Sequence, residues 1–231
     1  HQVIGVDVKK EKNDLINSGK APIFEKDLDH LLSEAHNSKR LIATDKVNDA
    51  IENSELSLVC VGTPSLPDGS VDLSYILKVC KEIATSIKLK NQYHVVVVRS
   101  TIPPGTIESN LVPLFEKISG KKVGKDFGFA MNPEFLREGS AIDDFYNPER
   151  IIVGTTDGRS LDSLTEIYKS TTNYKVTAPL FPVPIRLAEM CKYVDNTFHA
   201  LKVAFANEIG VIAKNLDVDG LELMKIFCED K

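Results

Sequence analysis

The sequence predicts an α/β fold with a doubly wound, mostly parallel sheet, followed by a long helix. Three observations support this prediction. Short apolar, β-branched segments alternate with amphipathic helical segments from residue 2 to about residue 177, which is typical of βαβ units. The four consecutive valines at 95–98 would place apolar side chains on both faces of the sheet, as in parallel strands that helices cover on both sides. After residue 184 one helical pattern continues for roughly 30 residues.

The expected elements follow one another in a regular order. The strand segments are Gln2–Asp7, Leu56–Val61, His94–Arg99, Phe127–Met131 and Arg150–Val153. The helical segments are Lys9–Ser18, Lys46–Asn53, Asp72–Lys88, Thr106–Ser119, Glu134–Ile142 and Leu161–Ser170. Turn residues agree with this order, since Pro-Asp-Gly at 67–69 and Pro-Pro-Gly at 103–105 precede two helices. We expect Asp72 and Thr106 to act as the N-caps of those helices.

The domain boundary is expected at the Pro-rich connector Ala178–Pro184, which separates residues 1–177 from residues 178–231. Ile185–Leu216 contains no Pro and one Gly, so a single helix of about 45 Å is expected. Its apolar positions are too many for one face: Leu187, Met190, Cys191, Val194, Phe198, Leu201, Phe205, Ile209 and Ile212. A second subunit is a natural candidate to cover them. A last short helix is expected at Leu221–Cys228.

The composition argues against several classes of function. A net charge of −5 argues against a nucleic-acid backbone as main partner, although a nucleotide cofactor needs only a few local donors. No apolar run approaches the roughly 18 residues of a membrane helix. The four cysteines are widely spaced without a CxxC pair, which favours a reduced, cytoplasmic setting and packed thiols over disulfides or a metal site.

The first expected strand ends in an acid, Asp7. At the end of the second strand of a Rossmann-like dinucleotide-binding fold, such a carboxylate binds the adenosine ribose and favours NAD over NADP. A surface turn is the alternative explanation for an acid here. The glycine-rich GxGxxG turn that should precede this strand by about 20 residues occurs nowhere in the sequence. We therefore expect the first βα unit to lie outside the chain, which should leave apolar surface uncovered.

Two pairs of polar residues have helical i, i+4 spacing. Glu134 and Glu138 follow a strand and a proline, so a helix there would point both carboxylates the same way at the ligand-binding edge of the sheet. Acids favoured by a helix N-terminus are the alternative. Lys192 and Asn196 lie in the long helix, where an ammonium and an amide can stabilise negative charge on one oxygen. A solvated helix face is the alternative for this second pair.

Seven segments, in order, resemble the nucleotide-sugar 6-dehydrogenase family, which includes UDP-glucose and GDP-mannose dehydrogenases. They are GVDV with Lys12, INSGKAPIFE, CVGTPS with DGSVDLSYI, VVVRSTIPPGT, NPEFLREGSAI, NPERIIVG, and AEMCKYVDNTFHALKVAFANEIG. The resemblance covers essentially the whole chain. It implies NAD as cofactor and a two-step oxidation of a sugar C6 alcohol to a uronic acid for polysaccharide biosynthesis, through a thioester on a cysteine.

The resemblance also implies roles for individual residues. The implied cofactor contacts are Asp7, Lys12, Thr63, Thr101 and Glu138. The implied catalytic residues are Thr101, Glu134, Glu138, Lys192 and Asn196, with Glu134 as the first choice for activating water. The implied substrate contacts are Glu134, Phe135, Leu136, Arg137, Lys192, Asn196 and His199. The family's nucleophilic cysteine belongs to a GGSCLPKD-type segment beyond this sequence, and Cys228 has different neighbours.

The substrate is predicted to be GDP-mannose, with UDP-glucose as the alternative. The Asn-x-x-His pattern that ends at His199, Arg99 and the FCED segment favour GDP-mannose, whereas NPERIIVG favours UDP-glucose. A packed or surface histidine is the other interpretation of His199. A 6-phosphogluconate- or hydroxyacyl-CoA-type dehydrogenase would lack NPEFLRE and STIPPGT. We expect a chain truncated at both ends and inactive alone, or else a non-catalytic remnant, and a homodimer through residues 185–216.

Overall fold

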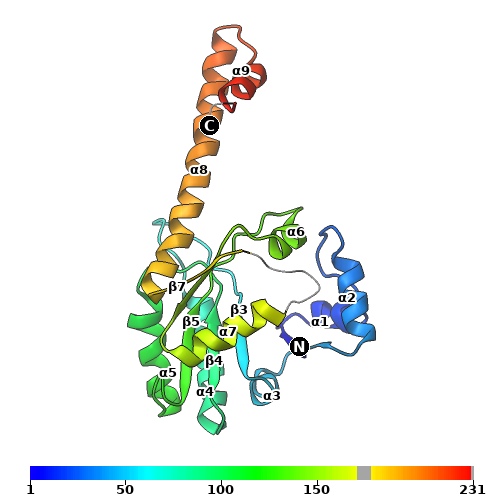
Figure 1. Ribbon diagram of the computed structural model, residues 1–231, viewed down its shortest axis with the longest axis vertical. Coiled ribbons are helices and arrows are strands. Elements are labelled where there is room, and N and C mark those ends of the chain that lie inside the picture. The colour runs from blue at the N-terminus through cyan, green and yellow to red at the C-terminus, as the bar shows by residue number, and fades with distance from the viewer. Residues whose placement is uncertain (171–177, 230–231) are drawn as a thin grey trace. The chain divides into compact units, whose positions relative to one another are not determined.

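The computed structural model describes residues 1–170 and 178–229 (Figure 1). The chain forms two compact units, His1–Met190 and Cys191–Lys231, and each is described by itself. The predicted fold class is confirmed, because the first unit is an α/β structure with a mostly parallel sheet and a long helix follows it. The predicted boundary between residues 177 and 178 stays a prediction.

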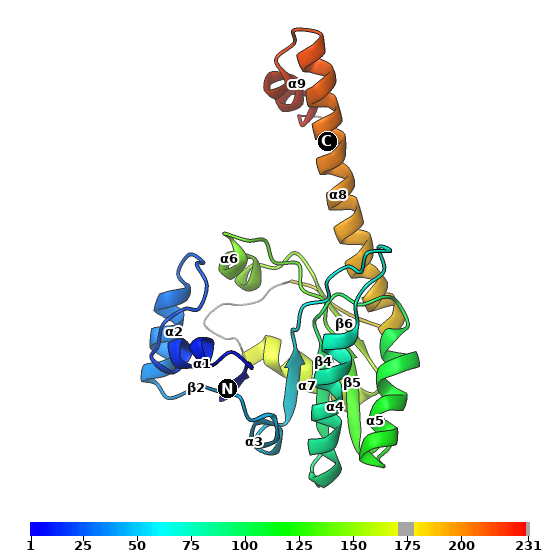
Figure 2. The same ribbon diagram turned by 180° about the vertical axis from the view of Figure 1, so that it is seen from behind.

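The main sheet of the first unit has five strands in the order β3-β4-β5-β6-β7. They are β3 (Leu56–Val59), β4 (His94–Val98), β5 (Phe127–Met131), β6 (Ile151–Thr155) and β7 (Leu180–Val183). All neighbours are parallel except β5 and β6. Helices α4 (Ser74–Leu89) and α5 (Val112–Ser119) cover one face, and α7 (Gly158–Ser170) covers the other (Figures 1 and 2).

The core lies on both faces of β4 and β5, whose residues are all buried. On one face Val95 and Val97 pack with Leu164 of α7. On the other face Phe129 meets Phe115 of α5 edge-on, with ring centroids 4.7 Å apart. The uninterrupted apolar sequence of these strands therefore follows from helices on both sides.

A separate two-stranded parallel sheet pairs β1 (Val3–Val6) with β2 (Leu41–Thr44). Helices α1 (Lys10–Asn17), α2 (Leu28–Asn37) and α3 (Val47–Glu52) accompany it. Within the described part of the chain, no strand joins β1 to β3. Val3, Val6 and Leu58 on these strands are exposed by 51%, 43% and 51%, so apolar side chains of both strands face solvent.

Three elements were missed by the sequence analysis: β2, α2 and β7. The segment Ala178–Pro184, interpreted as a connector, contains β7, which pairs with β6 from Ile151↔Leu180 to Gly154↔Val183. Pro182 is tolerated because β7 is an edge strand of the sheet.

The two residues expected to act as N-caps, Asp72 and Thr106, make different hydrogen bonds in the structure. The Asp72 prediction was wrong by one residue, since the N-cap of α4 is Leu73, although Asp72 Oδ1 accepts the amide of Ser74 at 2.8 Å. Thr106 occupies the N-cap position, but its side chain makes no cap bond, since its hydroxyl donates to the Pro103 carbonyl at 2.6 Å. The helix there begins with a π-helical turn, η1 (Ile107–Leu111), that runs into α5. Its first-turn amides are held by a distant side chain, Glu189, which accepts from Gly105 N and Ile107 N.

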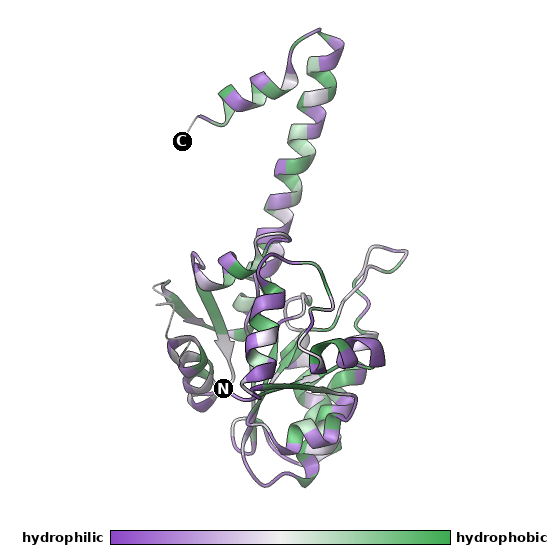
Figure 3. Cartoon of the chain, turned by 90° about the vertical axis from the view of Figure 1, so that its right-hand side faces the viewer, coloured by the Kyte–Doolittle hydropathy of each residue, from purple (hydrophilic) through white to green (hydrophobic). Residues whose placement is uncertain are grey.

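The long helix α8 (Ile185–Asn215, 31 residues) agrees with its prediction to within one residue at each end. Hydrophobic residues are distributed along much of its length (Figure 3). Helix α9 (Gly220–Phe227) begins at Asp219, whose carboxylate accepts two backbone amides, and Phe227 packs on Phe205 with ring centroids 5.6 Å apart. None of the described helices is both long and apolar enough to cross a membrane.

Candidate active site

The carboxyl ends of β3 and β4 bring two of the predicted site residues into contact. Thr63 follows β3 and Thr101 follows β4, and the Thr63 hydroxyl donates to the Thr101 carbonyl at 2.7 Å. The neighbouring Ser100 hydroxyl donates to the Val61 carbonyl at 2.6 Å. These bonds fix the two segments beyond the strands at the edge where parallel sheets bind ligands.

The carboxyl end of β5 is fixed by Asn132, a buried residue that the sequence analysis did not select. Its Oδ1 accepts from Arg99 Nη1 and from the Tyr168 hydroxyl, each at 2.6 Å, and its Nδ2 donates to the Ile152 carbonyl at 2.8 Å. Asn132 therefore joins β4, β5, β6 and α7 directly before Pro133 and Glu134. Its position immediately after a strand is the signal by which it could have been found.

The interpretation of Glu134 and Glu138 as neighbours on one helix face was wrong. Helix α6 begins only at Ala141 (Ala141–Tyr146), and residues 132–137 form no regular element. Glu134 Oε2 accepts the amide of Leu136 at 2.7 Å, so a side chain takes a donor that a helix would use otherwise. Gly139 has a φ of +83°, which also interrupts a helix.

Glu134 nevertheless lies close to the ends of β3 and β4. Desolvation raises the pKa of the Cys60 thiol at the end of β3, Arg99 opposes the rise, and the Glu134 carboxylate adds to it. The pKa of this one thiol thus depends on the charges of Arg99, which follows β4, and Glu134, which follows β5. The position of Glu134 shortly after the end of β5, rather than a shared helix face, is the reason to keep it as a candidate.

The predicted substrate contacts beside Glu134 differ in their surroundings. The Phe135 ring lies under the Arg150 guanidinium at 4.6 Å, and Leu136 is exposed. Arg137 pairs with Asp144 through Nη2 at 2.5 Å and Nε at 3.1 Å. This guanidinium lowers the pKa of Asp144 to about 2. The pairing fixes Arg137 against α6, and the substrate roles stay predictions.

Asp7 and Lys12 form an ion pair at the carboxyl end of β1. Lys12 Nζ lies 3.1 Å from Asp7 Oδ2, and the amide of Lys9 donates to Asp7 Oδ1 at 2.9 Å. The Lys9 amide, with Lys12 adding to it, lowers the pKa of Asp7. An ionised carboxylate at a strand end fits the ribose hydroxyls of a dinucleotide, because it can accept two hydrogen bonds.

Lys192, Asn196 and His199 lie in the second unit, on α8. Their spacing places them on one side of the helix. Lys192 is buried, with 6% exposure, whereas Asn196 and His199 are exposed. The premise that these residues share a helix face therefore holds.

Comparison with known proteins matches both parts of the chain to one family. Residues 1–172 match the NAD binding domain of the UDP-glucose/GDP-mannose dehydrogenase family, and residues 186–231 match its central domain. The chain belongs to this family. The NAD binding domain is the part that contains Asp7, Thr63, Thr101 and Glu134.

Within the UDP-glucose/GDP-mannose dehydrogenase family, the chain is similar to GDP-mannose 6-dehydrogenase of Pseudomonas aeruginosa, with 48% identity over 230 residues. The crystal structure of a ternary complex of GDP-mannose dehydrogenase from the same organism has a TM-score of 0.94 over 100% of this chain. A UDP-glucose dehydrogenase from Pyrobaculum islandicum has 38% identity and a TM-score of 0.90, and the chain covers 51% of it. The chain spans about half, 52%, of the Pseudomonas aeruginosa relative.

Proposed function

We propose that this chain forms the NAD-binding and central part of a nucleotide-sugar 6-dehydrogenase that oxidises the C6 alcohol of GDP-mannose to a uronic acid. The observation that supports it most is the contact between Thr63 and Thr101 beyond the carboxyl ends of β3 and β4, in a chain 48% identical to GDP-mannose 6-dehydrogenase of Pseudomonas aeruginosa. The residues of β1 fit the adenosine half of NAD, since Asp7 is ionised and lies at a strand end.

Each residue type has a chemical reason for its proposed role. NAD⁺ supplies the hydride acceptor when bound. Asp7 accepts hydrogen bonds from the adenosine ribose. Thr63 and Thr101 orient the nicotinamide half of NAD and the water molecule that takes part in the reaction. Glu134 takes a proton from that water as general base. Lys192 and Asn196 stabilise negative charge on the reacting oxygen.

The remaining roles belong to the same proposal. Glu138 contacts the cofactor, and Phe135, Leu136, Arg137 and His199 contact the nucleotide sugar. Polysaccharide biosynthesis as the use of the product, and the cytoplasmic setting expected from the cysteines, stay predictions.

The test of substrate choice is NADH production by the complete protein with GDP-mannose or UDP-glucose. We expect a higher kcat/KM for GDP-mannose. Activity with UDP-glucose and none with GDP-mannose would reject this preference and favour the alternative, a UDP-glucose 6-dehydrogenase. Its support is the NPERIIVG segment and the likeness to the Pyrobaculum islandicum enzyme.

The role of Lys192 is tested against a second lysine of the same helix. In the complete protein, Lys192→Ala should lower kcat by about 100-fold or more, as expected when a donor to a charged transition state is removed. Lys202→Ala is the matched control, because Lys202 contacts the ring of Phe198 at 4.8 Å and has no proposed catalytic role. Equal losses for the two variants would reject the assignment.

We further propose that, in the complete protein, the nucleophilic cysteine and the phosphate-binding turn lie in segments that correspond to the part of the relatives that this chain does not cover. The 231-residue chain alone should then bind NAD⁺ weakly and produce no steady NADH with either sugar nucleotide. Steady NADH production by the purified chain would refute this. If the complete protein is inactive with both nucleotides as well, the alternative of a non-catalytic, dimerising remnant is favoured.

The homodimer is proposed from the second unit. Large apolar side chains of α8 are exposed in the described part of the chain: Val194, Phe198, Leu201, Val203, Phe205, Val211 and Ile212. Covering such a surface by a second copy removes apolar area from water. Sedimentation at increasing concentration should reveal dimers, and Phe198→Asp should shift the equilibrium to monomer. Finding only monomer at every concentration would count against the dimer.

A further inference from the structure

The Glu25 carboxylate joins two segments that lie far apart in the sequence. Its Oε2 accepts the amide of Gly139 at 3.0 Å, and its Oε1 accepts the amide of Ala141 at 3.1 Å. The donors lie 114 and 116 residues beyond Glu25. The segment between α1 and α2, which contains Glu25, lies beside α6 in both Figures 1 and 2.

The two amides have no acceptor in their own helix. Ala141 is the first residue of α6, and the first amides of any helix lack intrahelical partners. Ser140, at the N-cap of α6, makes no side-chain cap bond. Gly139 lies in the turn before α6, in a left-handed conformation. Glu25 therefore supplies from a distant segment the acceptors that a local cap supplies in other helices.

The segment that presents Glu25 is organised by its own hydrogen bonds. The Leu28 amide donates to the Glu25 carbonyl at 3.2 Å, and the Ala21 amide donates to Asp29 Oδ1 at 2.8 Å. These bonds fix the backbone without using the Glu25 carboxylate. The carboxylate is thus left to accept the amides of Gly139 and Ala141 at the start of α6.

Each of the two joined segments is near a proposed cofactor contact in the sequence. Glu25 lies after α1. This helix contains Lys12 and begins shortly after Asp7, and these two residues are the proposed contacts of the adenosine ribose. Gly139 directly follows Glu138, another of the proposed cofactor contacts. Because the Gly139 amide is held by Glu25, the backbone of the preceding residue, Glu138, is also restricted in its position relative to the segment that follows α1.

We propose that Glu138 contacts the nicotinamide half of NAD, and that Glu25 is a positioning residue that sets Glu138 at the correct separation from Asp7 for one NAD molecule to reach both. This role rests on the proposed function. It makes the segment between α1 and α2 a determinant of affinity for the whole dinucleotide, and not for its adenosine half alone. An ADP molecule reaches only the β1 end, and its binding does not depend on Glu138.

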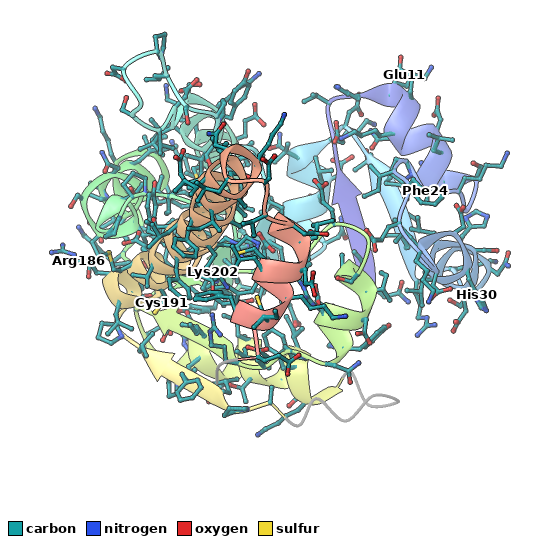
Figure 4. The ribbon with its side chains drawn as sticks, turned by 90° about the horizontal axis from the view of Figure 1, so that it is seen from above. Glu11, Phe24, His30, Arg186, Cys191 and Lys202 are labelled. Atoms are coloured by element: carbon teal, nitrogen blue, oxygen red, sulfur yellow. The ribbon has the colours of Figure 1, made fainter. Side chains whose placement is uncertain are left out.

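The test uses the purified 231-residue chain and NMR, which detects weak binding. Glu25→Ala should speed amide exchange at Gly139 and Ala141 and raise the dissociation constant of NAD⁺ by roughly fivefold, the equivalent of one net hydrogen bond. The dissociation constant of ADP should stay unchanged. Glu25→Gln, which keeps one amide oxygen as acceptor, should have an intermediate effect on NAD⁺. Glu11→Ala is the matched control, because Glu11 is exposed on α1 and points outward (Figure 4).

Each outcome decides between the proposals. Unchanged exchange at Gly139 and Ala141, or equal weakening of NAD⁺ and ADP, overturns the positioning role and leaves the proposed function intact. If the unsubstituted chain binds neither nucleotide, the proposed NAD function of this domain fails, and the positioning role fails with it. Selective weakening of NAD⁺ in Glu25→Ala, absent in Glu11→Ala, supports the role.

Discussion

His94 is expected to make the stability of this protein depend on pH between about 4 and 6.5. It is fully buried at the start of β4. Its Nδ1 lies 3.1 Å from the Ser54 carbonyl, which can only accept, so Nδ1 carries the proton. The Ser57 hydroxyl, 2.7 Å from Nε2, then donates to the second nitrogen. The neutral ring is therefore fully hydrogen-bonded, whereas a protonated ring would be a buried positive charge near Lys90.

The magnitude follows from the environment of the ring. Burial lowers the pKa of His94 from 6.5 to about 4, and the positive charge of Lys90 adds to the effect. Between these two values the unfolded chain binds a proton that the folded protein excludes, so stability falls as the pH falls from about 6.5 to about 4. The total loss from this group is about 3 kcal/mol, at about 1.4 kcal/mol per pH unit. Above pH 6.5 or so the contribution to stability is complete and constant.

The assay is urea unfolding of the chain at several pH values from 7 to 4, for the unsubstituted protein and for His94→Gln. The variant lacks the titrating ring, so the difference in unfolding free energy between the two proteins should shrink steadily below about pH 6.5. His30→Gln is the matched control, because His30 is exposed on α2 (Figure 4). Identical pH slopes for the unsubstituted protein and His94→Gln would refute the reasoning.

Two further predictions concern buried contacts of α8, both measured by urea unfolding. Glu189→Gln should lower the unfolding free energy by about 1–3 kcal/mol, because an amide NH₂ then faces a buried backbone donor, whereas Glu11→Gln should have no effect. Equal stability of these two variants would mean that the Glu189 carboxylate is not needed as an acceptor. Gly154→Ala should cost about 1–3 kcal/mol, since a Cβ there lies 2.8 Å from Ala188 Cβ, whereas Gly62 has open space around it. A loss of unfolding free energy no greater than that of Gly62→Ala would show that α8 moves away from the added methyl group without loss of stability.

The sequence predicted best those elements whose pattern is decided by burial alone. β5 was predicted with the bounds it has, Phe127–Met131, and α8 to within one residue at each end. Both have long, uninterrupted apolar or helical patterns, which local sequence determines. β2 was missed because only four residues, Leu41–Thr44, pair with β1, and this pairing partner is remote in the sequence. Strand β7 was missed because its proline suggests a connector, and only its edge position explains why it is tolerated.

The candidate site shows the same division between local and distant causes. Thr63 and Thr101 were selected through the family resemblance, and their hydrogen bond agrees with the rule that parallel strands end at one edge. The helix expected at Glu134 was an argument from spacing, and spacing has meaning only if the backbone is helical. Acceptors from elsewhere, above all Glu25, take the amides that a helix at 134–142 would have used. Sequence periodicity contains no information about such a distant acceptor.

The two i, i+4 pairs therefore differ in what now supports them. For Lys192 and Asn196 the helical premise holds, because both lie within α8. For Glu134 and Glu138 it fails, and the reason to group them with Thr101 becomes the shared edge of the sheet. If the grouping by strand ends is correct, the two glutamates need not act alike: Glu134 follows β5 closely and influences Cys60, whereas Glu138 is held through Glu25. Glu134→Gln should then impair turnover in the complete protein, and Glu25→Ala should impair NAD⁺ affinity instead.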